Sequence, residues 1–552
     1  MASYLPLECL SNIFNCIYDS ETLYSCLFVS RGWSNGVVPI LWRKPFSRLR
    51  FRYRSLSSNP KNGGLIIRTY LSCLPESKRN QFFSESHQPF SPPLFFYPAF
   101  LRELDFEGLY DEISDWLNTN FKNSKKILVD LDNSNDHYFT RNGLNNYDQN
   151  KFSMIEAIIE LIFKHCNYLD YIYFDVRRLP IVFTNILTRY CMLHNPMNDP
   201  SWFQRLTTLE YHGVGSNYTI PDCVSLDFLF SLSKVCQDLT YLKIRAFAAP
   251  TCDSLASLIQ SQKGLRKLFL WELNLHDISC IIEAVSSQSH SMREIEMFQC
   301  SFELCDSFEG LACCHKLNTL SIIQCDYLTS YLLDSLANTH FPYIKKLELK
   351  DFNYSLTNLN HEDIPSEQVK NIIKNCSDNL EELYTNLKLD DYFGIIETIS
   401  TYCTLITSLE LNMQKAEQIR ELLPILESCQ KLEKLIIQPY QPMRFPYYKV
   451  SNEQLRWFAT KLPSSVRHLE IRYWSICAQD LEDMLSICGR NLHYIAWGFT
   501  DVKVVGDQKY FSHVISEFCK KESRKIKRIG SPQFSCISEG SHQNNGTVFV
   551  EF

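Results

Sequence analysis

The chain has 552 residues, of which 45% are hydrophobic and 13% are aromatic, so it can bury large cores and is not intrinsically disordered. The formal net charge is -7, and Lys and Arg are spread along the chain, which argues against nucleic acid as a partner because phosphates require a basic surface. No apolar run reaches the roughly 20 residues of a membrane helix, and the N-terminus has no basic leader, so we expect no membrane partner and a location in the cytoplasm, the nucleus or both.

The first 47 residues are expected to form three short helices. Pro6 suits the start of a helix, and the apolar residues after it recur along one side. Asp19 or Ser20 can cap a second helix, and a third apolar segment runs from Trp33 to Trp42 after a break at residues 30–32. A module of this size buries too little surface to be stable by itself, so some of its side chains should meet another surface.

Residues 48–98 are expected to form a linker, helical between residues 59 and 80 and rich in Pro and Ser between residues 84 and 93. From residue 99 to residue 528 one pattern recurs: an apolar residue, two others, an apolar residue, one other and a third apolar residue. Its instances begin at Leu101, Leu169, Leu206, Leu239, Leu265, Met292, Leu317, Ile344, Leu380, Ile406, Leu432, Val466 and Leu492. Successive starts from Leu239 to Ile344 are 26, 27, 25 and 27 residues apart, a period typical of stacked repeats.

Strands and helices are expected to alternate in these repeats. The fourth and sixth residues of each pattern share one face of an extended strand. Apolar residues recur at helical spacing in residues 278–285, 369–376, 392–399 and 481–488, and Ser451 with Gln454 resembles a capping box. No single unit can bury its own apolar face. We therefore predict an α/β fold, a horseshoe-shaped solenoid with a parallel inner sheet and outer helices, followed by a tail at residues 529–552.

The repeats resemble the leucine-rich repeat family, although only Cys300 and Cys325 match the Asn or Cys that the family places at the ninth position. The N-terminal module resembles the F-box. The residues that carry this resemblance are Leu5, Pro6, Glu8, Ile13, Phe14, Leu27, Val29, Ser30, Arg31, Trp33 and Trp42, whereas Cys9 departs from the usual aliphatic residue.

The two resemblances together imply a substrate receptor of an SCF-type ubiquitin ligase. Its F-box would dock onto a Skp-type adaptor, and through it a cullin, while the repeats hold the client protein to be ubiquitylated. The adaptor anchors implied are Leu5, Pro6, Ile13, Phe14, Leu27, Trp33 and Trp42. This chain would then be a non-catalytic subunit. The alternative is a leucine-rich repeat interaction or inhibitor protein without a role in ubiquitylation, whose N-terminal helices only cap the solenoid.

Motifs of catalysis are missing from the sequence: there is no GxGxxG, P-loop, HExxH or GxSxG, and only 17 residues are Gly. The densest group of possible metal ligands, Cys300, Cys305, Cys313, Cys314 and His315, fits no zinc spacing. The 22 cysteines contain no CxxC pair and lie mostly in apolar segments, which predicts small buried hydrophobes. We expect no catalytic residue, no metal and no cofactor.

The third, fifth and seventh residues of each repeat are expected to face outward from the inner sheet. Consecutive seventh positions hold Arg245, Trp271, Phe298, Ile323 and Lys350, and Tyr241 and Phe269 occupy a third and a fifth position. These residues are the candidate client-binding site, an aromatic patch with Lys267 and Lys346 also at its basic rim. The alternative is that an inserted loop or the C-terminal tail covers the rings.

Overall fold

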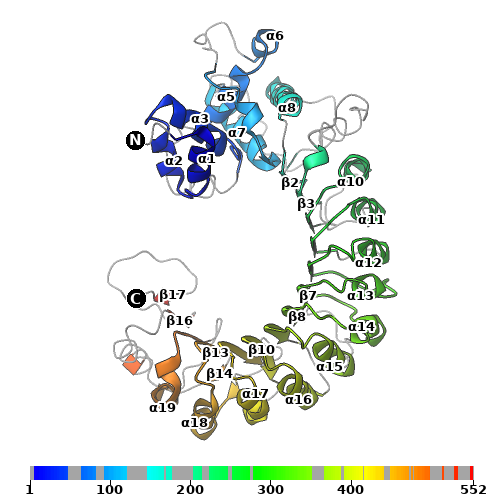
Figure 1. The fold of residues 1–552 in the computed structure, drawn as a ribbon, viewed down its shortest axis with the longest axis vertical. Coiled ribbons are helices and arrows are strands. Elements are labelled where there is room, and N and C mark those ends of the chain that lie inside the picture. The colour runs from blue at the N-terminus through cyan, green and yellow to red at the C-terminus, as the bar shows by residue number, and fades with distance from the viewer. Residues whose placement is uncertain are drawn as a thin grey trace, which may run out of the picture. The chain divides into compact units, whose positions relative to one another are not determined.

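The computed structural model describes residues 5–47, 64–82, 93–120, 146–166, 169–176, 179, 203–213, 223–245, 252–273, 278–350, 366–386, 391–413, 416–439, 448–471, 474–475, 478–497, 513–514, 528–531 and 548–550 (Figure 1). The chain forms two compact units, unit 1 (Met1–Leu265) and unit 2 (Arg266–Phe552). Among the described helices, none is long and apolar enough to cross a membrane. The Pro- and Ser-rich part of the predicted linker, residues 84–92, lies outside the described residues.

Unit 1 begins with three helices, α1 (Leu7–Asn15), α2 (Ser20–Cys26) and α3 (Arg31–Leu41), as predicted. Pro6 precedes α1 in an extended conformation. The Asp19 carboxylate caps α2 by accepting from the amides of Glu21 and Thr22 at 3.2 and 2.8 Å. The Ser30 hydroxyl caps α3 by accepting from the Trp33 amide at 3.2 Å, so the break before this helix lies just before Arg31.

The three helices share a core of their own. Its buried members are Leu10, Phe14, Leu23, Cys26 and Val37. Fully burying a large apolar side chain stabilises a fold by about 1.5–3 kcal/mol, so the burial of these residues helps to hold the three helices together. We call residues 5–47 the N-terminal module.

The rest of unit 1 joins this module to the first four repeats. Its helices and strands are α5 (Leu65–Ser72), α6 (Glu76–Arg79), η3 (Tyr97–Phe100), β1 (Glu103–Asp105), α7 (Phe106–Asn120), α8 (Asn146–His165), β2 (Tyr171–Asp175), η6 (Phe203–Arg205), β3 (Thr208–His212), α10 (Cys223–Val235), β4 (Tyr241–Arg245) and α11 (Cys252–Gln260). Helix α5 lies in the predicted linker but buries Ile67, Tyr70 and Leu71. The Tyr70 ring lies 5.2 Å from that of Phe46 and 5.9 Å from that of Trp42, so this segment packs against the end of the N-terminal module.

Unit 2 continues the alternation of strands and helices. Its elements are β5 (Lys267–Trp271), α12 (Ser279–Ser286), β6 (Glu294–Phe298), α13 (Glu309–Ala312), β7 (Thr319–Ile323), α14 (Ser330–Ala337), β8 (Lys346–Lys350), α15 (Ser366–Asn375), β9 (Glu382–Asn386), α16 (Tyr392–Tyr402), β10 (Ser408–Met413), η7 (Ala416–Leu422), α17 (Leu423–Ser428), β11 (Lys434–Pro439), β12 (Tyr448–Lys449), α18 (Asn452–Lys461), β13 (His468–Ile471), β14 (Trp474–Ser475), α19 (Ala478–Cys488), η8 (Gly489–Asn491), β15 (Tyr494–Trp497), β16 (Arg528–Ser531) and β17 (Val548–Val550). Within unit 2 the helices line the outer side of a curved stack of strands (Figure 1).

The predicted repeats are confirmed. Every instance of the apolar pattern leads into a strand, namely β1–β11, β13 and β15, and neighbouring strands within each unit pair in parallel. The predicted helices are found as α12, α15, α16 and α19, and Ser451 and Gln454 form the predicted capping box of α18. Among the described strands, β17, in the predicted tail, is the one that pairs antiparallel, with β16. This described part of the tail therefore extends the end of the sheet.

A recurring hydrogen-bond pattern ties each repeat to the next. The carbonyl of the second repeat residue accepts from the amides of the second and third residues of the following repeat. The Arg266 carbonyl, for example, accepts from Arg293 at 2.8 Å and from Glu294 at 3.0 Å. In unit 1 the carbonyl of Arg102 does the same for Asp170 and Tyr171. The shared carbonyl fixes the register of neighbouring strands.

Cysteine is used as a small buried hydrogen-bond donor in this solenoid. At the ninth repeat position, the Cys300 thiol donates to the Leu270 carbonyl at 3.3 Å and the Cys325 thiol to the Met297 carbonyl at 3.5 Å. At the ends of the helices, Cys236 and Cys429 are also buried. The Cys236 thiol donates to the Leu206 carbonyl at the start of its own repeat, and the Cys429 thiol donates to the Cys403 carbonyl of the preceding repeat. These contacts agree with the prediction that most of the cysteines are structural.

Candidate docking and client-binding surfaces

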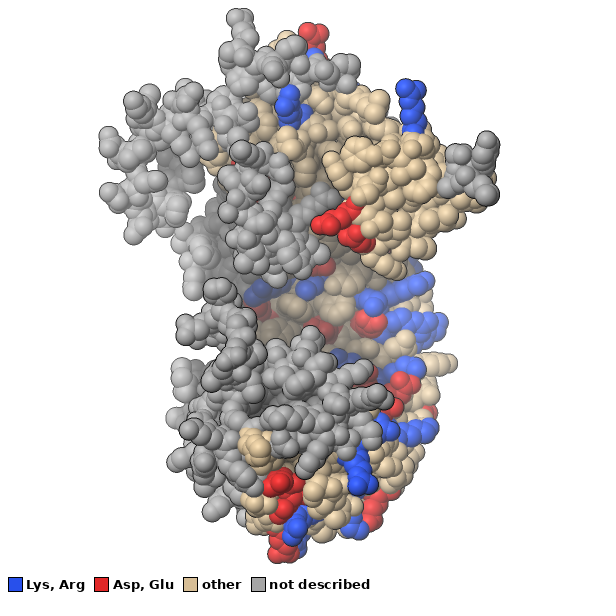
Figure 2. Space-filling view, turned by 90° about the vertical axis from the view of Figure 1, so that its left-hand side faces the viewer, with Lys and Arg blue, Asp and Glu red and all other residues tan. Residues whose placement is uncertain are grey.

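The N-terminal module exposes an unusual number of large apolar side chains. Leu5, Leu7 and Ile13, at α1, are 43%, 47% and 49% exposed, and Val29 is 58% exposed. In the space-filling view, the upper part of the molecule, where α1–α3 lie in Figure 1, presents a broad area without charged side chains (Figure 2). Apolar groups gathered on a surface do not stabilise the free chain and are typical of interaction sites, so this surface is the candidate docking site.

Six of the seven predicted adaptor anchors fall into three classes. Leu5, Pro6 and Ile13 are exposed and can contact a partner directly. Leu27 and Trp33 are partly buried against the core of the module. Phe14 is only 1% exposed, and its ring lies 5.2 Å from that of Trp33, so it supports the surface from inside.

Trp42 lies apart from the other predicted anchors. Its ring packs 4.2 Å from the ring of Tyr97 and 5.9 Å from that of Tyr70. Both partners belong to the region that follows the module, so Trp42 connects the module to the rest of unit 1.

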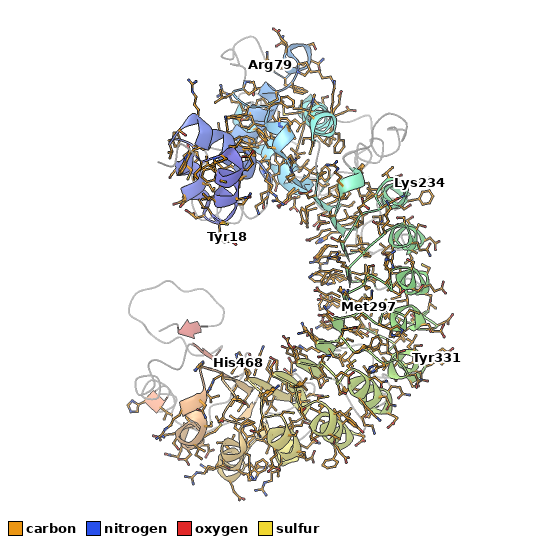
Figure 3. All side chains as sticks on the ribbon, viewed as in Figure 1. Tyr18, Arg79, Lys234, Met297, Tyr331 and His468 are labelled. Atoms are coloured by element: carbon orange, nitrogen blue, oxygen red, sulfur yellow. The ribbon has the colours of Figure 1, made fainter. Side chains whose placement is uncertain are left out.

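Sequence reasoning missed the aromatic residues around α2. Tyr18 is 99% exposed and projects from the module (Figure 3), and Tyr24 and Phe28 are 59% and 74% exposed. The rings of Tyr24 and Phe28 meet edge to face at 5.3 Å. The available signal was the spacing of four residues between Tyr24 and Phe28, which is typical of neighbours on one helical face. The buried residues Leu23 and Cys26 follow a separate face.

The N-terminal module also continues the hydrogen-bond pattern of the repeats. The Arg43 carbonyl accepts from the amides of Arg102 and Glu103 at 2.9 and 3.0 Å, as the second residue of a preceding repeat would. The Phe46 carbonyl lies so close to Gly108 that a Cβ there would be 1.8 Å from its oxygen. The residues from Trp42 to Phe46 therefore cap β1, as the alternative interpretation of these helices requires.

The predicted client-binding residues occupy the expected face of the strands. In β4, β5 and β6 burial alternates, so that Tyr241, Arg245, Phe269, Trp271 and Phe298 are half-buried between fully buried neighbours. Tyr241 and Arg245 belong to unit 1, and the other candidates, which include Ile323 and Lys350, belong to unit 2.

Trp271 and Phe298 form the centre of the patch in unit 2. Their rings lie 5.6 Å apart, and the indole Nε1–H of Trp271 donates to Glu296 Oε1 at 2.9 Å. The residues that follow the three strands β5, β6 and β7, namely Glu272, Gln299 and Gln324, all have positive φ angles between 52° and 59°. This left-handed backbone costs roughly 1–2 kcal/mol per residue, and the same sharp turn therefore ends each strand beside the patch.

The basic rim of this patch is neutralised by glutamates. Lys267 pairs with Glu294 at 2.8 Å, and Lys346 pairs with Glu348 at 3.0 Å. Lys350 contacts both Glu348 and Glu410, at 2.8 and 3.0 Å, and its side chain is only 13% exposed. Burial opposes ionisation of Glu348, but the two lysines outweigh it and hold its pKa below the usual range. Lys350 therefore organises the strand face and offers little charge to a client.

The cysteine and histidine group considered as a metal site does not converge. Cys300 and Cys314 are buried and donate to backbone carbonyls, whereas Cys313 is exposed. In the part of the chain that the structure describes, no group of three or more His, Cys, Asp or Glu side chains is arranged to hold a metal ion.

No family model matches this chain, and no curated protein matches it. Among solved structures, a chain of the yeast complex of Rad7 and Elc1 is similar, with 15% sequence identity and a TM-score of 0.35 over 62% of this chain and 79% of that one. The assignment of function therefore rests on the surfaces described above.

Proposed function

We propose that this chain is the substrate-recognition subunit of an SCF-type E3 ubiquitin ligase. The N-terminal module docks onto a Skp-type adaptor, which links it to a cullin, and the strand faces of the repeats bind a client protein. The chain itself is not catalytic, and ubiquitin transfer belongs to the other subunits.

The exposed apolar surface of the N-terminal module carries this proposal. Leu5, Ile13, Tyr24, Phe28 and Val29 are between 43% and 74% exposed, although the module has its own core. Aromatic and aliphatic groups clustered in this way are typical of the centres of protein interfaces. They also coincide with the region whose sequence resembles the F-box.

Capping of the repeats does not account for this surface. The capping contacts come from the segment Trp42 to Phe46, through the Arg43 and Phe46 carbonyls. Outward side chains of α1 and of the turn that follows α2, such as Ile13 and Phe28, remain exposed when the cap is formed. Capping and docking can therefore be tested with separate substitutions.

The alternative, a repeat protein without a role in ubiquitylation, is favoured by the capping contacts and predicts no adaptor complex. The test is to mix the purified full chain with a recombinant Skp-type adaptor and to measure the mass of the product by size-exclusion chromatography with light scattering. Our proposal predicts a stable complex with the wild-type chain, which Ile13→Asp disrupts. The matched control is Phe393→Asp on α16 in unit 2, because Phe393 is 56% exposed and Ile13 is 49% exposed.

Deletion of residues 1–45 is a poor substitute for these point variants. It would remove Arg43 together with the docking surface, so loss of binding could reflect an unfolded first repeat. Absence of a complex between the folded wild-type chain and the adaptor would contradict the proposal.

A further inference from the structure

A pocket opens on the strand face of unit 1, next to the end of the N-terminal module. Its volume is about 290 Å³. The residues that line it include Lys44, Glu103, Asp105, Tyr171, Tyr173 and Glu210. Apart from Lys44 and Ser47, the lining residues occupy third or fifth positions of the first three repeats, so the rule that located the aromatic patch also finds them.

Strand register sets the order of the groups across the pocket. Asp105 pairs with Tyr173 on the next strand, and Tyr173 pairs with Glu210 on the strand after that. Neighbouring strands lie about 4.8 Å apart, so the two carboxylates are separated by two strand spacings with a phenol ring between them. Among the described residues, no group of three or more His, Cys, Asp or Glu side chains is arranged to hold a metal ion.

Tyr173 is a rigid wall of the pocket. Its hydroxyl lies 3.3 Å from Asp175 Oδ2 and 3.3 Å from His212 Nδ1, and its ring meets the His212 ring edge to face at 5.0 Å. Both neighbours are buried. Because these contacts fix the phenol through its hydroxyl end, its position does not depend on what enters the pocket.

The charge of the lining is negative. It contains three carboxylates, from Glu103, Asp105 and Glu210, and one ammonium group, from Lys44. The ammonium lies 4.0 Å from Glu103 and its side chain is 55% exposed, so it makes a loose pair at the edge of the pocket. The Arg43 guanidinium also lies 3.2 Å from Glu103, so this carboxylate is already paired. Asp105, one oxygen of which accepts from the Gly108 amide at 3.0 Å, and Glu210 are the two carboxylates of the lining that favour a cation.

We propose that this pocket binds the guanidinium group of an arginine side chain carried by the client protein. A guanidinium is planar and presents donors along its edges, so it can lie against a tyrosine while bonding to carboxylates on either side. A compact ammonium can approach only one carboxylate closely, and a lysine-bearing segment should bind more weakly. The inference rests on the proposed function only in that it calls the partner a client.

The test uses ligand-observed NMR with the full chain, which detects weak binding. The probes are a Gly/Ser peptide with a single central Arg and the same peptide with citrulline, which keeps the shape but loses the charge. We expect the Arg peptide to bind about tenfold more tightly than the citrulline peptide. Equal binding of the two peptides would overturn the proposal, as would displacement of the Arg peptide by equimolar Mg²⁺.

Two substitutions with opposite expected effects on the affinity for the Arg peptide test whether it binds in this pocket. Glu210→Gln should weaken binding of the Arg peptide about fivefold, whereas Lys44→Ala should strengthen it because a competing cation is removed. The matched controls are Glu294→Gln and Lys345→Ala, which change the same charges in unit 2 and should leave binding unchanged. Lys44 is exposed, so its variant keeps the test valid if Glu210→Gln fails to fold.

Weaker binding with Lys44→Ala, or equal effects of the control variants, would contradict the assignment of the site. Adaptor binding is measured in the same preparations. If the Arg and citrulline peptides bind equally while the adaptor still binds, only the proposed pocket is rejected. If the adaptor does not bind while the Arg peptide still binds more tightly, only the proposed ligase role is rejected.

Discussion

The carbonyl oxygen of Arg43 accepts a hydrogen bond from the Glu103 amide at 3.0 Å, and the guanidinium of the same arginine lies 3.2 Å from the Glu103 carboxylate. The backbone contact reproduces the bond that joins consecutive repeats. The end of the N-terminal module thus takes the place of a repeat before the first one. This end of the module caps the first repeat, and the outward faces of α1 and α2 remain available to the proposed partner.

The contact between the module and α7 can be tested with two glycines of unit 1. Gly108→Ala would place a Cβ 1.8 Å from the Phe46 carbonyl oxygen, whereas Gly264→Ala meets nothing within 4 Å. We expect Gly108→Ala to lower the free energy of unfolding of unit 1 by about 1–3 kcal/mol and to speed amide exchange in β1. Gly264→Ala should have little effect. Urea denaturation and hydrogen exchange measure both quantities, and equal stability of the two variants would contradict the close contact.

The buried thiols should resist labelling at neutral pH. Burial raises the pKa of Cys236, Cys314, Cys403 and Cys488 to about 12. Because a raised pKa leaves the thiol protonated, the reactive thiolate is a fraction of about one in ten thousand at pH 8.

Among the described cysteines, iodoacetamide at pH 8 should therefore modify the exposed Cys9, Cys16 and Cys313 first. Mass spectrometry of the labelled peptides gives the order of reaction, with urea-unfolded protein as the control in which the order disappears. Early labelling of Cys236 or Cys403 in the folded chain would contradict their structural role.

The patch centred on Trp271 and Phe298 is expected to bind the client. Trp271→Ala combined with Phe298→Ala removes the paired rings and the bond to Glu296, and should abolish client capture while adaptor binding is unchanged. Quantitative mass spectrometry of proteins recovered with wild-type and variant chains provides the comparison. Tyr331→Ala together with Phe393→Ala, which truncates exposed rings on the outer helices, is the control (Figure 3). Recovery of the same proteins at the same level with the patch variant would remove this assignment.

The repeat architecture could be predicted because it depends on short-range patterns. Leu268 and Leu270 alternate with Phe269 along one strand, and their spacing from Ile295 and Met297 repeats in the next, so both the strands and their outward face follow from the sequence. The capping box at Ser451 and Gln454 is equally local.

The ion pairs and side-chain hydrogen bonds of the strand face could not be predicted in the same way. Lys350 pairs with Glu410 on a strand two positions further along the sheet, and Trp271 with Glu296 on its neighbour. Such partners are set by register across repeats, which the spacing of leucines does not specify in detail. The cap formed by the Arg43 carbonyl could not be predicted either, because every residue type has a backbone carbonyl and the sequence does not indicate which one makes this contact.

The central claim is tested most directly by the affinity of the full chain for a purified Skp-type adaptor, measured by isothermal titration calorimetry. The variant is Ile13→Asp with Phe28→Ser, both on the exposed surface of the N-terminal module, and the control is Phe393→Ser on α16. We predict tight binding by the wild-type and control chains, and at least about a hundredfold loss with the double variant, which corresponds to two contacts of roughly 1.4 kcal/mol or more each. Wild-type affinity in the double variant, or no binding of the adaptor by the wild-type chain at any of several temperatures, would contradict the account.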